Sequence, residues 1–135
     1  MAESILLHFR SASAQDVLRR IAPVTEKAAD RELYSYPPGA DYLLLITPYE
    51  DYATEYDDDQ QAELERMLEA RPHGSLDFEL RRSRSDAACD ATVEILRKLS
   101  AEFSFVVDDC ARFWLASEAI SSSHFLDLYR YAKKA

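Results

Sequence analysis

Glycine is scarce in this sequence of 135 residues, which has only Gly39 and Gly74. Phosphate-binding loops and dinucleotide-binding turns need two or three glycines within a few residues, because only glycine lets the backbone approach a phosphate closely. The nucleophile elbow of the α/β-hydrolases needs a glycine on each side of its serine. Two glycines so far apart therefore exclude all three motifs.

Cysteines and long apolar runs are also few. Cys89 and Cys110 do not form a CxxC pair, and neither has a histidine close to it in sequence. We therefore expect reduced thiols in a cytoplasmic protein rather than a disulfide. No apolar run has the length that a bilayer requires. The first ten residues lack a basic start and a long apolar stretch, so we expect no secretory signal.

Negative charge is concentrated in one part of the sequence. The formal net charge is −9, and residues 41–70 alone carry ten acidic residues against one basic residue. The segments before and after this one are close to neutral. A concentrated negative field repels nucleic acids and anionic membranes and attracts basic surfaces. We therefore expect neither a nucleic-acid partner nor a membrane partner.

The length is that of a single domain, which we place at residues 1–135. Apolar residues make up 47% of the sequence and charged residues 30%, which is globular composition. This size is sufficient to bury a self-supporting core. No internal repeat, linker or low-complexity tract divides the chain outside the acidic segment.

Apolar periodicity divides the domain into strands and helices. Residues 42–49 are apolar on both faces, which is typical of a central strand, whereas residues 75–82 alternate as a strand with one face in water. Ser13 and Asp16 predict a capped helix start, and Pro23 should kink or divide that helix before it continues to about residue 30. The expected strands are 4–10, 33–36, 42–49, 75–82, 105–107 and 112–115, and the expected helices are 13–30, 59–70, 85–103 and 123–133. This order predicts an α+β fold with a mixed, mostly antiparallel sheet of four to six strands and helices packed mainly on one face.

The stretch ITPYEDYATEYDDDQQ, residues 46–61, changes abruptly from apolar to acidic. An EF-hand calcium loop beginning at Asp51 would need oxygen ligands at its third and twelfth positions and glycine at its sixth. Those positions hold Ala53, Ala62 and Tyr56. A two-metal nuclease site needs carboxylates that converge from different elements, and consecutive acids diverge instead. We therefore expect no metal site and no cofactor.

The end of this stretch has the pattern of a helix start. Asp57 lies three residues before Gln60, and Asp58 lies three residues before Gln61, so each pair fits a capping arrangement. Acidic side chains in the first turn also interact favourably with the helix dipole. This interpretation explains part of the acidic run and leaves a second role open.

A single helix cap does not explain six acids and three tyrosines within eleven residues. Tyrosine beside carboxylates is a composition suited to protein interfaces, because the ring supplies contact area and the acids steer a basic partner. The alternative is that the tyrosines pack at the rim of the core. The expected partner-binding residues are Tyr49, Glu50, Asp51, Tyr52, Glu55, Tyr56, Asp57, Asp58 and Asp59.

Catalytic patterns are weak in the rest of the chain. A nucleophilic pair between Cys110 and either His8 or His124 is compatible with the spacing, although structural roles for these residues are favoured. Residues 81–84 form a small basic patch that is too short for a nucleic-acid groove and that could pair with the acidic run. We assign no catalytic residue and expect a protein that is not an enzyme.

Three stretches resemble the small acidic immunity proteins that bacteria encode beside polymorphic or contact-dependent toxins. They are SILLHFRSASAQDVLRRIAP, DYLLLITPYEDY and FVVDDCARFW. The resemblance lies in size, layout and charge, and it implies a cytoplasmic inhibitor that binds one cognate toxin tightly and performs no chemistry. It implies no particular site residues. The charge agrees with it, because an acidic surface speeds the capture of a basic toxin.

Two alternatives from other classes remain open at this point. One is a small enzyme or ligand-binding domain with a pocket near the tyrosine-rich exit of the strand at 42–49. The other is an adaptor or oligomerisation domain, since the oligomeric state does not follow from the sequence.

Overall fold

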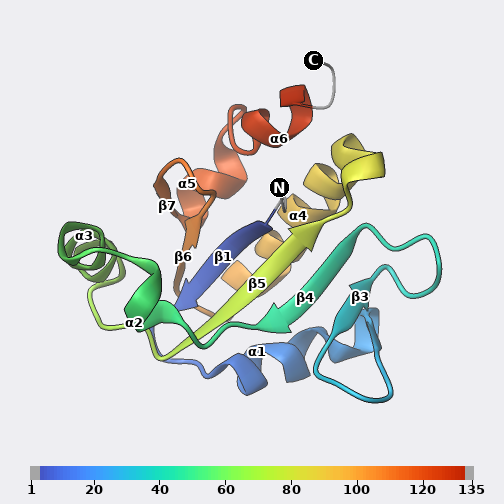
Figure 1. Ribbon diagram of the computed structural model, residues 1–135, viewed down its shortest axis with the longest axis horizontal. Coiled ribbons are helices and arrows are strands. Elements are labelled where there is room, and N and C mark those ends of the chain that lie inside the picture. The colour runs from blue at the N-terminus through green and yellow to red at the C-terminus, as the bar shows by residue number, and fades with distance from the viewer. Residues whose placement is uncertain (1–3, 133–135) are drawn as a thin grey trace.

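The computed structural model describes residues 4–132, which form one antiparallel sheet with helices packed against it (Figure 1). The strands are β1 (Ser4–Phe9), β2 (Glu26–Lys27), β3 (Tyr34–Tyr36), β4 (Leu44–Pro48), β5 (Gly74–Leu80), β6 (Phe105–Asp108) and β7 (Phe113–Leu115). The helices are α1 (Ala14–Ile21), α2 (Tyr52–Glu55), α3 (Asp58–Leu68), α4 (Ser85–Ser100), α5 (Ala116–Ser121) and α6 (Asp127–Ala132), with short 3₁₀ helices η1 (Ala22–Val24) and η2 (Arg82–Arg84). The predicted α+β class is confirmed.

The described strands run in the order β2-β3-β4-β5-β1-β6-β7, and every neighbouring pair is antiparallel. The sheet thus has seven strands where four to six were expected. β1 lies between β5 and β6, and its Leu6 is paired with Asp77 on one side and with Asp108 on the other. Strands that are distant in sequence therefore meet at β1.

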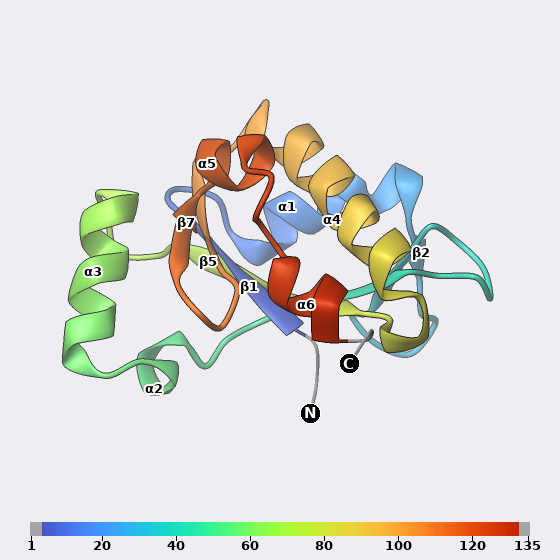
Figure 2. The same cartoon turned by 90° about the horizontal axis from the view of Figure 1, so that it is seen from above.

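The larger hydrophobic core lies between one face of the sheet and helices α1 and α4. Val17, Leu18 and Ile21 of α1 are completely buried, as their helical spacing predicted. The Ser13 hydroxyl accepts a hydrogen bond from the Asp16 amide, so the predicted capping box is present. Figure 2 shows α1 and α4 on the same side of the molecule, with α3 standing apart from them.

A second, smaller core forms on the opposite face of the sheet. Leu64 and Leu68 of α3 are buried against Leu6, Val106 and Phe113 from the last strands of the sheet. Alternation along β1 explains both cores, because its odd residues face α1 and α4 while its even residues face α3. The helices therefore lie mainly, but not solely, on one face.

Two predicted elements are corrected by the structure. The first helix does not continue to residue 30. It ends at Ile21, and η1, which contains Pro23, follows it. Glu26–Lys27 then forms β2, the additional strand that was not expected. Proline lacks the amide hydrogen that would continue the helix, and the Thr25 hydroxyl donates to the free carbonyl of Ile21 at 3.0 Å. β4 is not the central strand. Only its face with Leu44 and Ile46 is fully buried, whereas the sequence predicted burial of both faces.

The C-terminal part differs from the single helix expected at 123–133. Its described residues form two short helices, α5 and α6, and residue 133 lies outside the described range.

Edge strand β7 already uses backbone groups for contacts within the chain. The Leu115 amide donates to Glu118 at 3.0 Å, and Arg112 donates to the Phe113 carbonyl at 3.3 Å. These contacts leave β7 a poorer template for pairing with a further strand.

Gly74 allows β5 to approach the start of α1 very closely. A β-carbon at this position would lie 2.4 Å from the backbone nitrogen of Ala14 and 2.7 Å from the carbonyl carbon of Ser13. We expect Gly74→Ala to lower the free energy of unfolding by about 2 kcal/mol or more, because the clash is with backbone atoms that cannot rotate away. Urea denaturation measures this change.

Gly39→Ala is the matched control for this substitution. Gly39 has a φ of +104°, but nothing lies within 4 Å of an added β-carbon. Its substitution should cost about 1 kcal/mol through backbone strain alone. A Gly74 variant that is no less stable than the Gly39 variant would contradict the close approach.

Candidate functional site

The acidic segment forms the short helix α2 and the longer helix α3, which follow the end of β4. The Asp51 carbonyl accepts from the Thr54 and Glu55 amides at 3.1 and 3.0 Å, which forms α2. Asp57 caps α3: its carboxylate accepts from the Gln60 amide at 2.8 Å while the Gln60 side chain accepts from the Asp57 amide. The predicted cap is thus confirmed for Asp57 and Gln60.

Six carboxylates of the predicted surface are exposed to solvent. The ion pairs found among the described residues do not involve any of them, so their charge is not neutralised within this part of the chain. These six residues are defined here as the acidic surface: Glu50, Asp51, Glu55, Asp57, Asp58 and Asp59.

The three tyrosines of the predicted surface turn towards the sheet. Tyr49 donates to Glu55 at 2.6 Å, and Tyr52 donates to Glu65 at 2.8 Å; both rings are half-buried. Tyr56 is buried, with 8% of its surface exposed. The tyrosines therefore belong to the second core, and the structure places Tyr56 beneath the acidic surface rather than on it.

Tyr56 is the middle member of a buried hydrogen-bond chain. Its hydroxyl donates to the Asp108 carboxylate at 2.5 Å and lies 2.8 Å from Nε2 of His8. Since the only hydroxyl proton of Tyr56 points to Asp108, we assign the imidazole proton to Nε2, which donates to the tyrosine oxygen. Nδ1 of His8 then accepts from the Ser75 hydroxyl at 2.7 Å. This network joins β5, β1, the α2–α3 junction and β6.

Burial sets the protonation of the network. It lowers the pKa of His8 to about 4, because the completely buried imidazole would have to carry its charge away from water. Burial, together with the neighbouring Asp108, raises the pKa of Tyr56. The pKa of Asp108 is also raised by burial, although the bonds from Tyr56 and from the Cys110 amide act against this rise. At neutral pH the histidine is neutral and the tyrosine keeps its proton.

The fold also brings carboxylates from other elements close to the acidic surface. Glu55 contributes to raising the pKa values of both Asp77 on β5 and Asp108 on β6, although burial is the main cause in each case. Asp109 follows Asp108 and is buried in the β6–β7 turn, where it accepts from the Trp114 indole at 2.8 Å. Within residues 4–132, no group of three or more His, Cys, Asp or Glu residues is arranged to hold a metal ion.

Sequence reasoning missed Asp77 and Asp108 as part of this region. Asp77 was expected on the solvent face of its strand, and Asp108 in the turn of a hairpin. Both flank Leu6 of β1 because β5 and β6 pair with the two sides of that strand. Alternation indicated which face Asp77 would occupy, but no local pattern indicated that β1 would join these two strands.

The structure does not bring Cys110 together with either histidine named as its possible partner. Both ring nitrogens of His8 are occupied by Ser75 and Tyr56, and His124 contacts Asp127 at 3.1 Å. The Cys110 thiol donates to the Ser4 carbonyl at 3.3 Å, and burial raises its pKa. A raised pKa leaves less thiolate at neutral pH, which weakens a nucleophile.

Cys89 is buried and Cys110 is exposed, and no disulfide joins the two. The basic patch at 81–84 lies away from the acidic surface and contacts the loop before β4. Arg81 donates to the carbonyls of Ala40 and Tyr42 at 3.0 Å, and Arg84 lies 4.0 Å from Asp41. The suggested pairing between this patch and residues 49–59 is therefore corrected.

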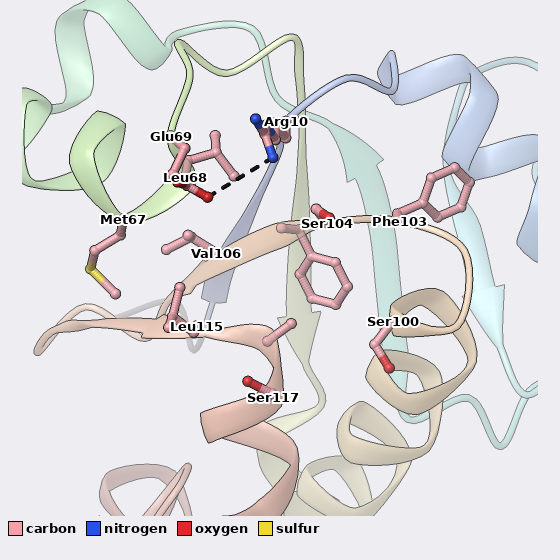
Figure 3. Close-up of a pocket in the computed structure, with 12 residues that line it drawn as sticks. Arg10, Met67, Leu68, Glu69, Ser100, Phe103, Ser104, Val106, Leu115 and Ser117 are labelled. Atoms are coloured by element: carbon pink, nitrogen blue, oxygen red, sulfur yellow. Dashed lines mark ion pairs between the residues drawn. The ribbon is translucent and has the colours of Figure 1, made fainter.

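The described part of the molecule has several hollows. One of about 390 Å³ lies between the end of α3, the strands β6 and β7, and the start of α5, with Leu68, Val106 and Leu115 in its wall and the Arg10–Glu69 ion pair at its rim (Figure 3). A second, of about 330 Å³, lies between α3 and the β6–β7 turn and includes Asp108. The third, of about 380 Å³, lies at the tyrosine-rich exit of β4.

Comparisons with models of protein families, with curated proteins and with solved structures give no match for this chain. No helix of residues 4–132 has the length and apolar character needed to cross a membrane.

The Tyr56 hydroxyl should contribute measurably to stability. We expect Tyr56→Phe to lower the free energy of unfolding by about 1–3 kcal/mol, because it leaves a buried imidazole N–H and a buried carboxylate without their partner. Tyr49→Phe removes a hydroxyl near the surface and should cost less than about 1 kcal/mol. Urea denaturation of both variants tests the difference, and equal losses would contradict the role of the buried network.

Lowering the pH should destabilise the protein through His8. The folded-state pKa of about 4 lies below the ordinary histidine pKa of 6.5, so the unfolded chain binds the proton more readily between these values. Stability from this group is fully present above pH 6.5 and is lost as the pH falls towards 4, by about 3 kcal/mol.

The raised pKa values of Asp77 and Asp108 act in the opposite direction, because the folded state takes up those protons more readily. The comparison of the wild-type protein with His8→Gln isolates the histidine effect. The stability difference between the two proteins should shrink from pH 7 to pH 4. A difference that stays constant over this range would show that His8 is not the responsible group.

Proposed function

We propose that this chain is a non-catalytic binding protein of the immunity type, which acts in the cytoplasm and neutralises a cognate toxin by covering part of its surface. The toxin would present a basic surface to the acidic surface defined above.

The observation that carries the proposal is a set of exposed carboxylates whose charge is not neutralised among the described residues. Six acids lie within ten residues, around α2 and the start of α3, and Tyr56 between the two helices bonds to Asp108 of the sheet. Neighbouring like charges repel each other and lower the stability of the free protein. A basic partner would relieve this repulsion on binding, which supports a role in association rather than in folding.

The arrangement also supports fast capture of the partner. A concentrated negative field can raise association rates by one or more orders of magnitude at low ionic strength. The half-buried tyrosine rings beneath the acids hold the surface in one conformation, so less ordering is needed on binding. Rapid and pre-organised binding is what the neutralisation of a toxin requires.

An enzymatic function has less support from the geometry. The hollow at the exit of β4 is lined by Tyr49, Tyr52, His73 and Ser75, but the Ser75 hydroxyl is already bonded to His8. Cys110 and the histidines are separated, as described above. This hollow would suit recognition of a side chain more readily than acid–base chemistry.

The product of the adjacent reading frame is the partner to test first, with its toxic activity disabled if necessary. The triple variant D51N/E55Q/D58N keeps the shape of the acidic surface and removes three charges. Its association rate at low salt should fall by about tenfold relative to the wild-type protein, and less at high salt, where exposed charges are screened. Stopped-flow fluorescence measures both rates.

The control variant D30N/E32Q/D41N removes the same number of charges from the other end of the molecule. These residues lie between β2 and β3 and before β4, away from α2 and α3 (Figure 1). Its association rate should stay within about twofold of the wild-type rate if the location of the charge matters. An unchanged rate in the first variant, or equal losses in both, would overturn the proposed role of the acidic surface.

A further inference from the structure

One face of β4 and β5 is not covered by any helix of residues 4–132. Figure 1 shows α4 on the far side of the sheet and no helix in front of β4 and β5. Their buried side chains, such as Ile46 and Phe78, point to the larger core, while the alternate residues point away from it. The outer β4–β5 face is defined here by these alternate residues: Leu45, Thr47, Asp77 and Glu79.

This face is acidic and joins the acidic surface at the end of β4. Leu45 is paired with Glu79, and Thr47 with Asp77, so the two acids lie on the same face of one strand, two residues apart. Asp77 and Glu55 both influence the half-buried Tyr49, which stands between β4 and α2. The acidic region therefore extends from α2 across the sheet.

The charges on this face are crowded. Burial is the main reason that the pKa of Asp77 is raised. A hydrogen bond from the Ser4 side chain acts against this rise, and the neighbouring Glu79 and Glu55 add to it. None of these three carboxylates takes part in the ion pairs found among the described residues. A half-buried carboxylate beside two others is unfavourable in the free protein and would be stabilised by a cation.

We propose that the outer β4–β5 face docks a cationic segment of the partner polypeptide, with a lysine or arginine side chain lying between Glu55, Asp77 and Glu79. The proposal rests on the proposed function and extends its contact region from the acidic run onto the sheet. Leu45 and Thr47 supply apolar area for the stem of the basic side chain. Tyr49 borders the same place, since its hydroxyl donates to Glu55 and Asp77 influences its pKa, and an aromatic ring near a cation adds to its binding.

A cationic peptide occupies this face better than other partners would. A nucleic acid or an acidic protein would meet three carboxylates, and a purely apolar surface would bury them without a counter-charge. A second copy of this chain would bring the same negative charges against each other. Charge complementarity therefore selects a basic polypeptide.

The test is an NMR titration of the ¹⁵N-labelled protein with a hexa-arginine peptide at low salt. The proposal expects amide shifts at Leu45, Thr47, Asp77 and Glu79, together with Tyr49 and α2. The variant D77N/E79Q should bind the peptide about tenfold more weakly and be no less stable to heat, because it removes crowded charges without removing volume. The control D30N/E32Q should change the affinity by less than about twofold.

The outcomes separate this inference from the proposed function. Shifts confined to Asp57–Asp59 and the rest of α3, or spread evenly over all exposed acids, would overturn the sheet-face site and leave the acidic surface as the place of binding. The absence of salt-sensitive binding anywhere would overturn both proposals. The wild-type shift map decides the question even if D77N/E79Q does not fold.

Discussion

The hydrogen bonds from Ser75 through His8 and Tyr56 to Asp108 are the constraint on which the functional surface depends. They connect three neighbouring strands to the junction of α2 and α3, across a face of the sheet that has only a small hydrophobic core. Each polar group in this hydrogen-bond network is buried, and leaving any of them without a partner would lower the stability of the protein. Satisfying all of them at once requires one position of Tyr56, and hence one position of the acidic residues on either side of it.

This constraint explains how so much negative charge is tolerated next to a small core. The aromatic rings of Tyr52 and Tyr56 pack around His8 with centroid distances of 5.7 and 5.5 Å, and the Tyr49 and Tyr52 hydroxyls bind carboxylates at the surface. The tyrosines thus separate a neutral interior from a charged exterior. A surface held this firmly would present its charges to a partner in a fixed pattern, which supports specific recognition over diffuse attraction.

Local sequence patterns predicted much of the fold because they depend on contacts between near neighbours. The capping residues Ser13 and Asp57, the buried stripe of α1 and the alternation of β5 all involve residues separated by two to four positions. The prediction was wrong after Pro23, where a short strand follows instead of a helix. Strand β2 is only two residues long, and its pairing with β3 is a tertiary contact that its own sequence does not encode.

The candidate site was only partly accessible to the same reasoning. The sequence by itself determined where the net charge lies, that a capped helix begins within Asp57–Asp59, and that glycine-dependent phosphate sites are excluded. Only the tertiary structure decided that Tyr56 is buried and that Asp77 and Asp108 flank the same residue of β1. The physical reason is that charge, caps and periodicity are properties of neighbouring residues, whereas strand order brings together side chains that no local pattern relates.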